Sequence, residues 1–163
     1  MKHLLIIAIA LVAFSCNSKA QDTTKKTENT SFSVVKTDTE WKEALSPLAY
    51  NVLREAGTER PFSSPINKNY KTGIYVCAAC AAPLFESEHK FDSGTGWPSF
   101  DREIEGNVAF DTDNNLGYIR TEEHCATCGG HLGHVFSDGP KATTGKRHCI
   151  NGAALKFIPT KDE

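Results

Sequence analysis

The sequence predicts a mainly β fold, in which antiparallel sheet packs on itself behind short N-terminal helices. Beyond Gly73, brief apolar runs typical of strands follow one another, and no helices alternate with them as a parallel sheet would require. Between Thr39 and Ala56, apolar residues recur at nearly helical spacing instead. The chain has 163 residues, 39% of them hydrophobic and 23% charged, which fits one globular domain.

Residues 1–16 have the pattern of an export signal. Lys2 and His3 supply a positive start, and residues 4–14 form an apolar run too short to span a bilayer. Small residues then lead into Cys16 and resemble the lipobox of bacterial lipoproteins. We predict an exported lipoprotein of the periplasm or cell envelope, held to the membrane by a lipid on Cys16. Cleavage after Ala20, which would release a soluble secreted protein, is the alternative.

The next segment, residues 17–31, is polar and contains no large apolar side chain. It buries too little surface to fold, so we predict a flexible tether followed by a folded domain over residues 32–163. The formal net charge of the chain is -2 and its sequence pI is about 6.3. This charge provides no basic field to hold nucleic acid, so a nucleic-acid partner is not expected.

The helical segment shows signals for its start, an interruption and its end. Asp38 or Thr39 is the predicted cap of its first turn. Pro47 interrupts the helical pattern, and Gly57 follows its last periodic residue. We therefore expect two short helices rather than one.

The strand-like runs are short and separated by turn residues. One of these separators, residues 111–115, is rich in Asp and Asn and predicts a hairpin between the runs on either side of it. The expected strands are 74–76, 108–110, 118–119, 134–136 and 155–158.

Two Cys-x-x-Cys pairs, Cys77 with Cys80 and Cys125 with Cys128, have the spacing of zinc knuckles. Two such knuckles make a four-cysteine site with no open coordination position, which contributes folding energy rather than catalysis. Two disulfides or redox-active Cys-x-x-Cys motifs are the alternatives. Neither pair lies in a thioredoxin-like βαβ pattern, so we predict one structural zinc ion.

Cys149 is the cysteine left over when the two pairs and Cys16 are set aside. If residues 147–151 form a strand, Arg147 lies on the same face as Cys149, and together with the adjacent His148 it would lower the pKa of the thiol. Asn151, again two residues along, could offer its amide to a bound polar group. The alternative is an inert cysteine buried in a terminal strand. The cationic flank favours a nucleophile.

Two histidines and two aromatic residues complete the candidates. His131 and His134 follow the second knuckle and are suited to moving protons near neutral pH. They are otherwise ligands of a Cys₂His₂ metal site, or ordinary surface or core residues. Trp97 and Phe100 follow a Gly-Thr-Gly turn and are candidates to contact an apolar part of the substrate, with burial in the core as the alternative.

Together these motifs resemble one family, the methionine-(R)-sulfoxide reductases called MsrB. The resemblance extends from about residue 39 to residue 158, and several motifs in the same order leave little room for chance. The matching segments are residues 57–62, 77–85, 90–100, 125–136 and 147–157.

The resemblance implies two antiparallel sheets, zinc in the Cys₄ site and Cys149 as the residue that attacks the sulfoxide sulfur. It implies that His134, assisted by His131 and Asn151, protonates the oxygen, leaving Cys149 as a sulfenic acid. Trp97 would hold the S-methyl group. The preference for the R epimer also comes from the resemblance. The expected substrate is methionine sulfoxide in proteins or peptides, and the protein is expected to be a monomer.

Three positions depart from the family. Many members have a resolving cysteine where this chain has Thr95, so we predict that an external thiol or a thioredoxin-like protein regenerates Cys149 directly. The family usually has Tyr and Ser at the positions of His148 and Gly152, and these departures bear on rate and pH optimum.

Two rival functions follow from the cysteine pairs. A zinc-ribbon binding module would show a basic stripe with interleaved aromatic residues, and this chain has none. A thiol-disulfide oxidoreductase would use one Cys-x-x-Cys pair for catalysis and hold no zinc.

Overall fold

The computed structural model describes residues 32–160. The predicted signal, the lipobox cysteine and the tether lie outside these residues. Within the described part, no helix has the length and hydropathy needed to cross a bilayer.

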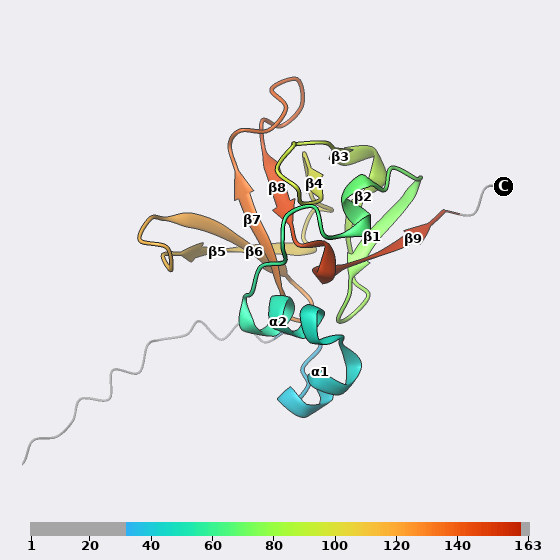
Figure 1. Cartoon of the computed structure of the whole chain (residues 1–163), viewed down its shortest axis with the longest axis vertical. Helices are drawn as coiled ribbons and strands as arrows, with labels where there is room; N and C mark the ends of the chain where they lie inside the picture. Colours follow the sequence, from blue (N-terminus) through green and yellow to red (C-terminus); the bar gives the residue numbers. More distant parts are fainter. Residues whose placement is uncertain (1–31, 161–163) are drawn as a thin grey trace, which may run out of the picture. The chain divides into compact units, whose positions relative to one another are not determined.

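Two helices open the described chain (Figure 1), as the interrupted pattern predicts: α1 (Asp38–Ala44) and α2 (Pro47–Glu55). Thr37 caps α1 rather than the predicted Asp38 or Thr39, because its hydroxyl and the Glu40 carboxylate form a reciprocal capping box. Ser46 caps α2, and Pro47 occupies the first turn, where no N–H is needed.

The strands form two antiparallel sheets, which confirms the predicted fold class. The first has three strands in the order β2 (Pro83–Glu86), β1 (Gly73–Cys77) and β9 (Leu155–Pro159). The second has six strands in the order β3 (Lys90–Phe91), β4 (Ser99–Phe100), β8 (Arg147–Ile150), β7 (His131–Phe136), β6 (Arg120–Cys125) and β5 (Val108–Asp113). Three short 3₁₀ turns lie at Pro65–Lys68, Ser87–His89 and Gly152–Ala154.

Aromatic residues from both sheets meet in the core. Phe85 of β2 stacks on Phe100 of β4 with ring centroids 4.4 Å apart, and Tyr75 of β1 meets the same ring edge-on at 5.0 Å. On the other face of the larger sheet, α2 packs against β7, where Leu132 is fully buried. Buried apolar side chains from both sheets and from both helices form one hydrophobic cluster.

The β5–β6 hairpin differs from the sequence prediction. Residues 111–113, predicted to be turn, complete β5, and Tyr118 and Ile119, predicted to be strand, precede β6 and are exposed. Strand β6 is largely polar: Glu122 contacts His131 of β7, and Glu123 contacts His148 of β8. In Figure 1 this hairpin extends away from the rest of the sheet.

Candidate active site and cysteine cluster

Two hairpins bring the four paired cysteines together. Cys77 ends β1 and Cys125 ends β6, and each is followed by a tight turn carrying its partner. The Sγ atoms of Cys77 and Cys128 lie 3.8 Å apart, and those of Cys80 and Cys125 lie 3.6 Å apart. All four sulfur atoms fall within 4.8 Å of one another, so the predicted four-cysteine cluster is present.

The sulfur spacing distinguishes between the chemical alternatives. A disulfide would bring two sulfurs to about 2.05 Å, and no disulfide joins the described cysteines. A tetrahedral zinc ion with Zn–S bonds of about 2.3 Å sets its sulfurs about 3.8 Å apart, which fits this cluster. The Cys₂His₂ alternative is wrong, because His131 and His134 bind carboxylates and are not part of the cluster.

Cys149 lies on β8 between β4 and β7, where it is partly buried and opposite Ser99 on one side and His134 on the other. Because side chains alternate along a strand, Arg147 and Cys149 share one face of the sheet and His148 points to the other. Residues directly opposite on antiparallel strands have neighbouring side chains. The register therefore places the His134 imidazole beside the thiol.

His148 does not flank the thiol as predicted, because its ring lies in the core. Its Nδ1 atom is 2.5 Å from an oxygen of Glu123, and its Nε2 atom is 3.2 Å from an oxygen of Glu103. Both His148 and Glu123 are completely buried. Burial raises the pKa of Glu123, and the contact with His148 opposes that rise.

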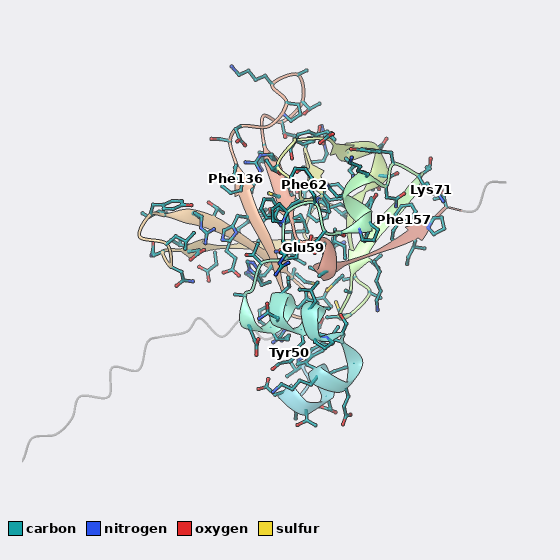
Figure 2. The ribbon with its side chains drawn as sticks, in the orientation of Figure 1. Tyr50, Glu59, Phe62, Lys71, Phe136 and Phe157 are labelled. Carbon is teal, nitrogen blue, oxygen red and sulfur yellow. The ribbon has the colours of Figure 1, made fainter. Side chains whose placement is uncertain are left out.

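Arg147 binds Asp138, and its charge still acts on Cys149. Its guanidinium makes two 2.9 Å hydrogen bonds to Asp138 and lies 4.4 Å from the ring centre of Phe136, which ends β7 (Figure 2). Burial raises the pKa of the Cys149 thiol, while the Thr95 hydroxyl and the charge of Arg147 lower it. The net direction is upward because burial is the largest cause, and the predicted lowering by Arg147 is present as a smaller opposing effect.

Each site histidine is held by a carboxylate. His134 Nε2 lies 2.8 Å from Asp113, and His131 Nδ1 lies 2.5 Å from Glu122. The hydrogen bond from the backbone N–H of Asn115 is the largest cause that lowers the pKa of Asp113 to about 2, and the hydrogen bond with His134 is the second. The hydrogen bond from His131 lowers the pKa of Glu122. Burial lowers the pKa of His134 against the opposing effect of Asp113. The two rings lie 5.4 Å apart.

A buried carboxylate, Glu59, connects three parts of the site. Its side chain accepts hydrogen bonds from the N–H groups of Gly152 and Ala153, at 2.7 and 2.8 Å. Its backbone carbonyl accepts a 3.2 Å hydrogen bond from the indole of Trp97. Its backbone N–H donates to Asn151 at 3.0 Å. Glu59 thus fixes the positions of Trp97 and Asn151, and Figure 2 shows it above α2.

Asn151 and Phe100 are placed differently from their predicted roles. The Asn151 amide accepts from Glu59 and donates to the carbonyl of Leu132 at 3.0 Å, so it holds the backbone around Cys149. Phe100 is completely buried in the core, on the face of β4 opposite the thiol's neighbour Ser99. Phe100 is therefore a packing residue rather than a substrate contact.

Sequence reasoning assigned no role to Glu59 or Phe62. Phe62 is 65% exposed and has a left-handed backbone, and its N–H donates to the carbonyl of Gly96 at 2.7 Å. It thus lies beside the Trp97 loop, and Figure 2 shows its side chain above that of Glu59. Both residues lie in the segment 57–62. This segment was used only as one of the motifs that carry the family resemblance.

Comparison with known proteins identifies the family. A model described as the SelR domain matches residues 45–159. A peptide methionine sulfoxide reductase MsrB of Bradyrhizobium diazoefficiens is 53% identical over 135 residues, which cover 82% of this chain and 96% of the relative. The MsrB proteins of Agrobacterium fabrum and Methanosarcina barkeri are each 52% identical, over 80% and 76% of this chain and 96% and 87% of their own lengths. The chain therefore belongs to the MsrB family.

Proposed function

We propose that this protein reduces methionine (R)-sulfoxide in peptides or proteins to methionine, with Cys149 as the nucleophile. The observation that carries the proposal is the arrangement around one thiol. Cys149 lies opposite His134 on the same face of the sheet, and a loop with an indole held by Glu59 adjoins the same strand. The family relatives bear names that state the same activity.

The proposed first step transfers oxygen from one sulfur to another. The Cys149 thiolate attacks the sulfoxide sulfur and a proton is added to the oxygen. The oxygen then passes to the Cys149 sulfur as the substrate S–O bond and the transient S–S bond break, and methionine leaves. Cys149 is then a sulfenic acid, oxidised by two electrons while the substrate sulfur is reduced by two. Trp97 is the proposed contact for the S-methyl group, and Arg147 favours the ionised form of the thiol.

The carboxylate partners determine how the histidines handle protons. An ionised carboxylate only accepts hydrogen bonds, so the proton on His134 Nε2 points to Asp113. The other nitrogen, Nδ1, is then the atom that carries the transferable proton when the ring is an imidazolium. The same reasoning assigns Nε2 of His131 this role, because its Nδ1 faces Glu122. We propose His134 as the acid and His131 as its assistant.

Regeneration of Cys149 requires a thiol from outside the domain. The other described cysteines belong to the four-cysteine cluster. A thiolate of a small thiol or of a thioredoxin-like protein would attack the sulfenic acid, releasing water and leaving a mixed disulfide on Cys149. A second thiol of the reductant would then free Cys149 and leave as a disulfide.

We further propose that Cys77, Cys80, Cys125 and Cys128 hold one zinc ion. Four thiolates at tetrahedral spacing are the ligands of structural zinc. The ion supplies folding energy, because it joins the β1–β2 and β6–β7 turns. It takes no part in the reaction with sulfoxide.

We also propose that the protein is exported and anchored by a lipid on Cys16, with cleavage after Ala20 as the alternative. The support is the sequence of residues 1–16 alone. An expressing bacterium supplied with labelled palmitate should label the wild type and not Cys16→Ser. Absence of label from the wild type would contradict the anchor.

The activity is tested with purified full-length protein, dithiothreitol, and the separate R and S epimers of a blocked methionine sulfoxide. We expect reduction of the R epimer alone, and loss of that reduction in Cys149→Ser. Turnover by Cys149→Ser would exclude this nucleophile. No turnover of either epimer by metal-loaded wild type would overturn the proposed function.

A further inference from the structure

Three hydroxyl groups connect the Cys149 sulfur to the buried start of β4. Thr95 Oγ1 lies 3.9 Å from Cys149 Sγ, and Ser93 Oγ lies 2.8 Å from Thr95 Oγ1. Ser93 Oγ also lies 2.7 Å from Ser99 Oγ, which is completely buried. The sequence therefore places a continuous row of three hydroxyls beside the Cys149 sulfur.

The row of hydroxyls ends at a backbone carbonyl. This acceptor fixes the direction of every hydrogen bond along the row in one of its two arrangements. Ser99 Oγ donates to the carbonyl of Trp97 at 3.1 Å. Since each hydroxyl has one hydrogen, Ser93 then donates to Ser99, and Thr95 donates to Ser93. Thr95 is left as an acceptor for the S–H of Cys149. This arrangement satisfies the neutral thiol.

The opposite arrangement satisfies a thiolate. When the thiol has lost its proton to a base in solution, Thr95 can rotate its hydrogen toward the sulfur. Ser93 then donates to Thr95, and Ser99 donates to Ser93, whose oxygen also accepts from the N–H of Thr95 at 3.4 Å. Three rotations convert one arrangement into the other with no movement of heavy atoms, and the second arrangement gives up the hydrogen bond from Ser99 to the Trp97 carbonyl.

We propose that Thr95, Ser93 and Ser99 form a reversible hydroxyl relay that accepts from Cys149 as a thiol and donates to it as a thiolate. The relay supplies the hydrogen bond that stabilises the thiolate of this partly buried sulfur, while the proton itself leaves to a base in solution. Its function here rests on the proposed role of Cys149 as nucleophile.

Charged groups on other elements also act on this sulfur. Arg147 on β8 favours the thiolate, and Glu123 on β6 disfavours it. His134 on β7 lies directly opposite Cys149 in the register. Burial raises the pKa of Cys149, and the Thr95 hydrogen bond is the foremost opposing effect. Removing this hydroxyl should therefore shift ionisation more than any change farther along the relay.

The test is the pH dependence of iodoacetamide alkylation at Cys149 in the full-length protein, followed on the peptide that contains it by mass spectrometry. No sulfoxide is present, so the result is independent of the proposed activity. In Thr95→Val, we expect the thiolate fraction at pH 7 to fall about tenfold, equivalent to one pKa unit. Thr95→Ser should restore it, and Ser93→Ala should give a smaller fall in the same direction.

Thr143→Val removes an exposed hydroxyl away from Cys149 and serves as the matched control. Its alkylation profile should match the wild type. Equal profiles for wild type, Thr95→Val and Ser93→Ala would overturn the relay. If Thr95→Val fails to fold, the profiles of Thr95→Ser and Ser93→Ala decide: a wild-type value for the first and a lowered value for the second support the relay, and any other pair contradicts it.

Discussion

Thr95 Oγ1 and Cys149 Sγ lie 3.9 Å apart, although 54 residues separate them along the chain. This contact brings the Gly-Thr-Gly loop to the one described cysteine outside the four-cysteine cluster. The Thr95 position is thus within reach of the sulfur that would be oxidised during turnover. A thiol at this position would lie near enough to react with a sulfenic acid.

Thr95→Cys should therefore convert the protein to a two-cysteine cycle. After one turnover without reductant, we expect an internal disulfide between residues 95 and 149, because a neighbouring thiol attacks a sulfenic acid faster than one in solution. The intact mass should show the loss of two hydrogens, and the wild type should show a sulfenic acid instead. A sulfenic acid persisting in Thr95→Cys would show that the two side chains cannot approach closely enough.

The four-cysteine cluster should be required for folding. Cys125 is completely buried, and Cys125→Ser should abolish metal binding and cooperative unfolding, because structural zinc sites contribute apparent free energies of about 10–16 kcal/mol. Metal content and circular dichroism measure both effects. Cys149→Ser is the matched control and should keep the metal and the fold. If Cys125→Ser holds no metal and still unfolds cooperatively, the cluster is not required for folding.

The sequence predicts the features of this fold that depend on local patterns. Pro47 and the helical spacing around it predict two helices, and Cys-x-x-Cys spacing predicts the cluster, because turns of this length bring two thiols together. The order of the strands on which these elements lie follows from contacts distant in sequence, such as β8 between β4 and β7. No local pattern contains that order.

The polar strand β6 shows why other parts of the site were missed. Glu122 and Glu123 are adjacent in sequence but serve opposite faces, with one binding His131 and the other His148. Both residue types usually lie in water, so their pattern does not predict a strand. Glu59 was missed for a second reason. The backbone N–H groups that bind its side chain are more than 90 residues away in the sequence.

Glu59→Gln should destabilise the protein and misplace the Trp97 loop. The amide offers one acceptor oxygen to two backbone N–H groups and turns its own donor toward one of them. A buried donor left without a partner costs about 1–3 kcal/mol, which is the expected loss in the free energy of urea unfolding. Glu105→Gln, at an exposed position, should unfold like the wild type. Equal stability of Glu59→Gln and wild type would show that the hydrogen bonds from Gly152 and Ala153 to the Glu59 side chain do not stabilise the fold.

The pH dependence of kcat/KM should show a broad plateau. Burial raises the pKa of Cys149 above its usual 9.0 and lowers that of His134 below 6.5. The productive form needs thiolate and imidazolium together, so it is a minor species whose fraction is constant between the two pKa values. Below the pKa of His134, the imidazolium fraction no longer rises as pH falls, so the falling thiolate fraction lowers the rate. Above the pKa of Cys149, the thiolate fraction no longer rises, so the falling imidazolium fraction lowers the rate.

His134→Gln distinguishes the two groups. With no imidazolium at this position, kcat/KM should follow the thiolate alone and rise with pH from about 6 to above 9. The plateau should be replaced by a slope, at a lower absolute rate. A plateau retained in His134→Gln would assign the proton donor to His131, and His131→Gln would then be the variant that shows the slope.

The buried His148 and Glu123 pair should determine stability more than activity. His148→Phe would leave the buried Glu123 side chain without its hydrogen-bond partner in the core, and a buried polar group left unpaired costs about 1–3 kcal/mol. His148→Tyr places a hydroxyl donor in the same region and should lose less. Urea unfolding of the two variants measures the difference. Because the His148 ring points away from the face that carries Cys149, kcat/KM of folded His148→Tyr should remain near the wild-type value. A large loss of kcat/KM without loss of stability would mean that this pair acts on the thiol across the sheet.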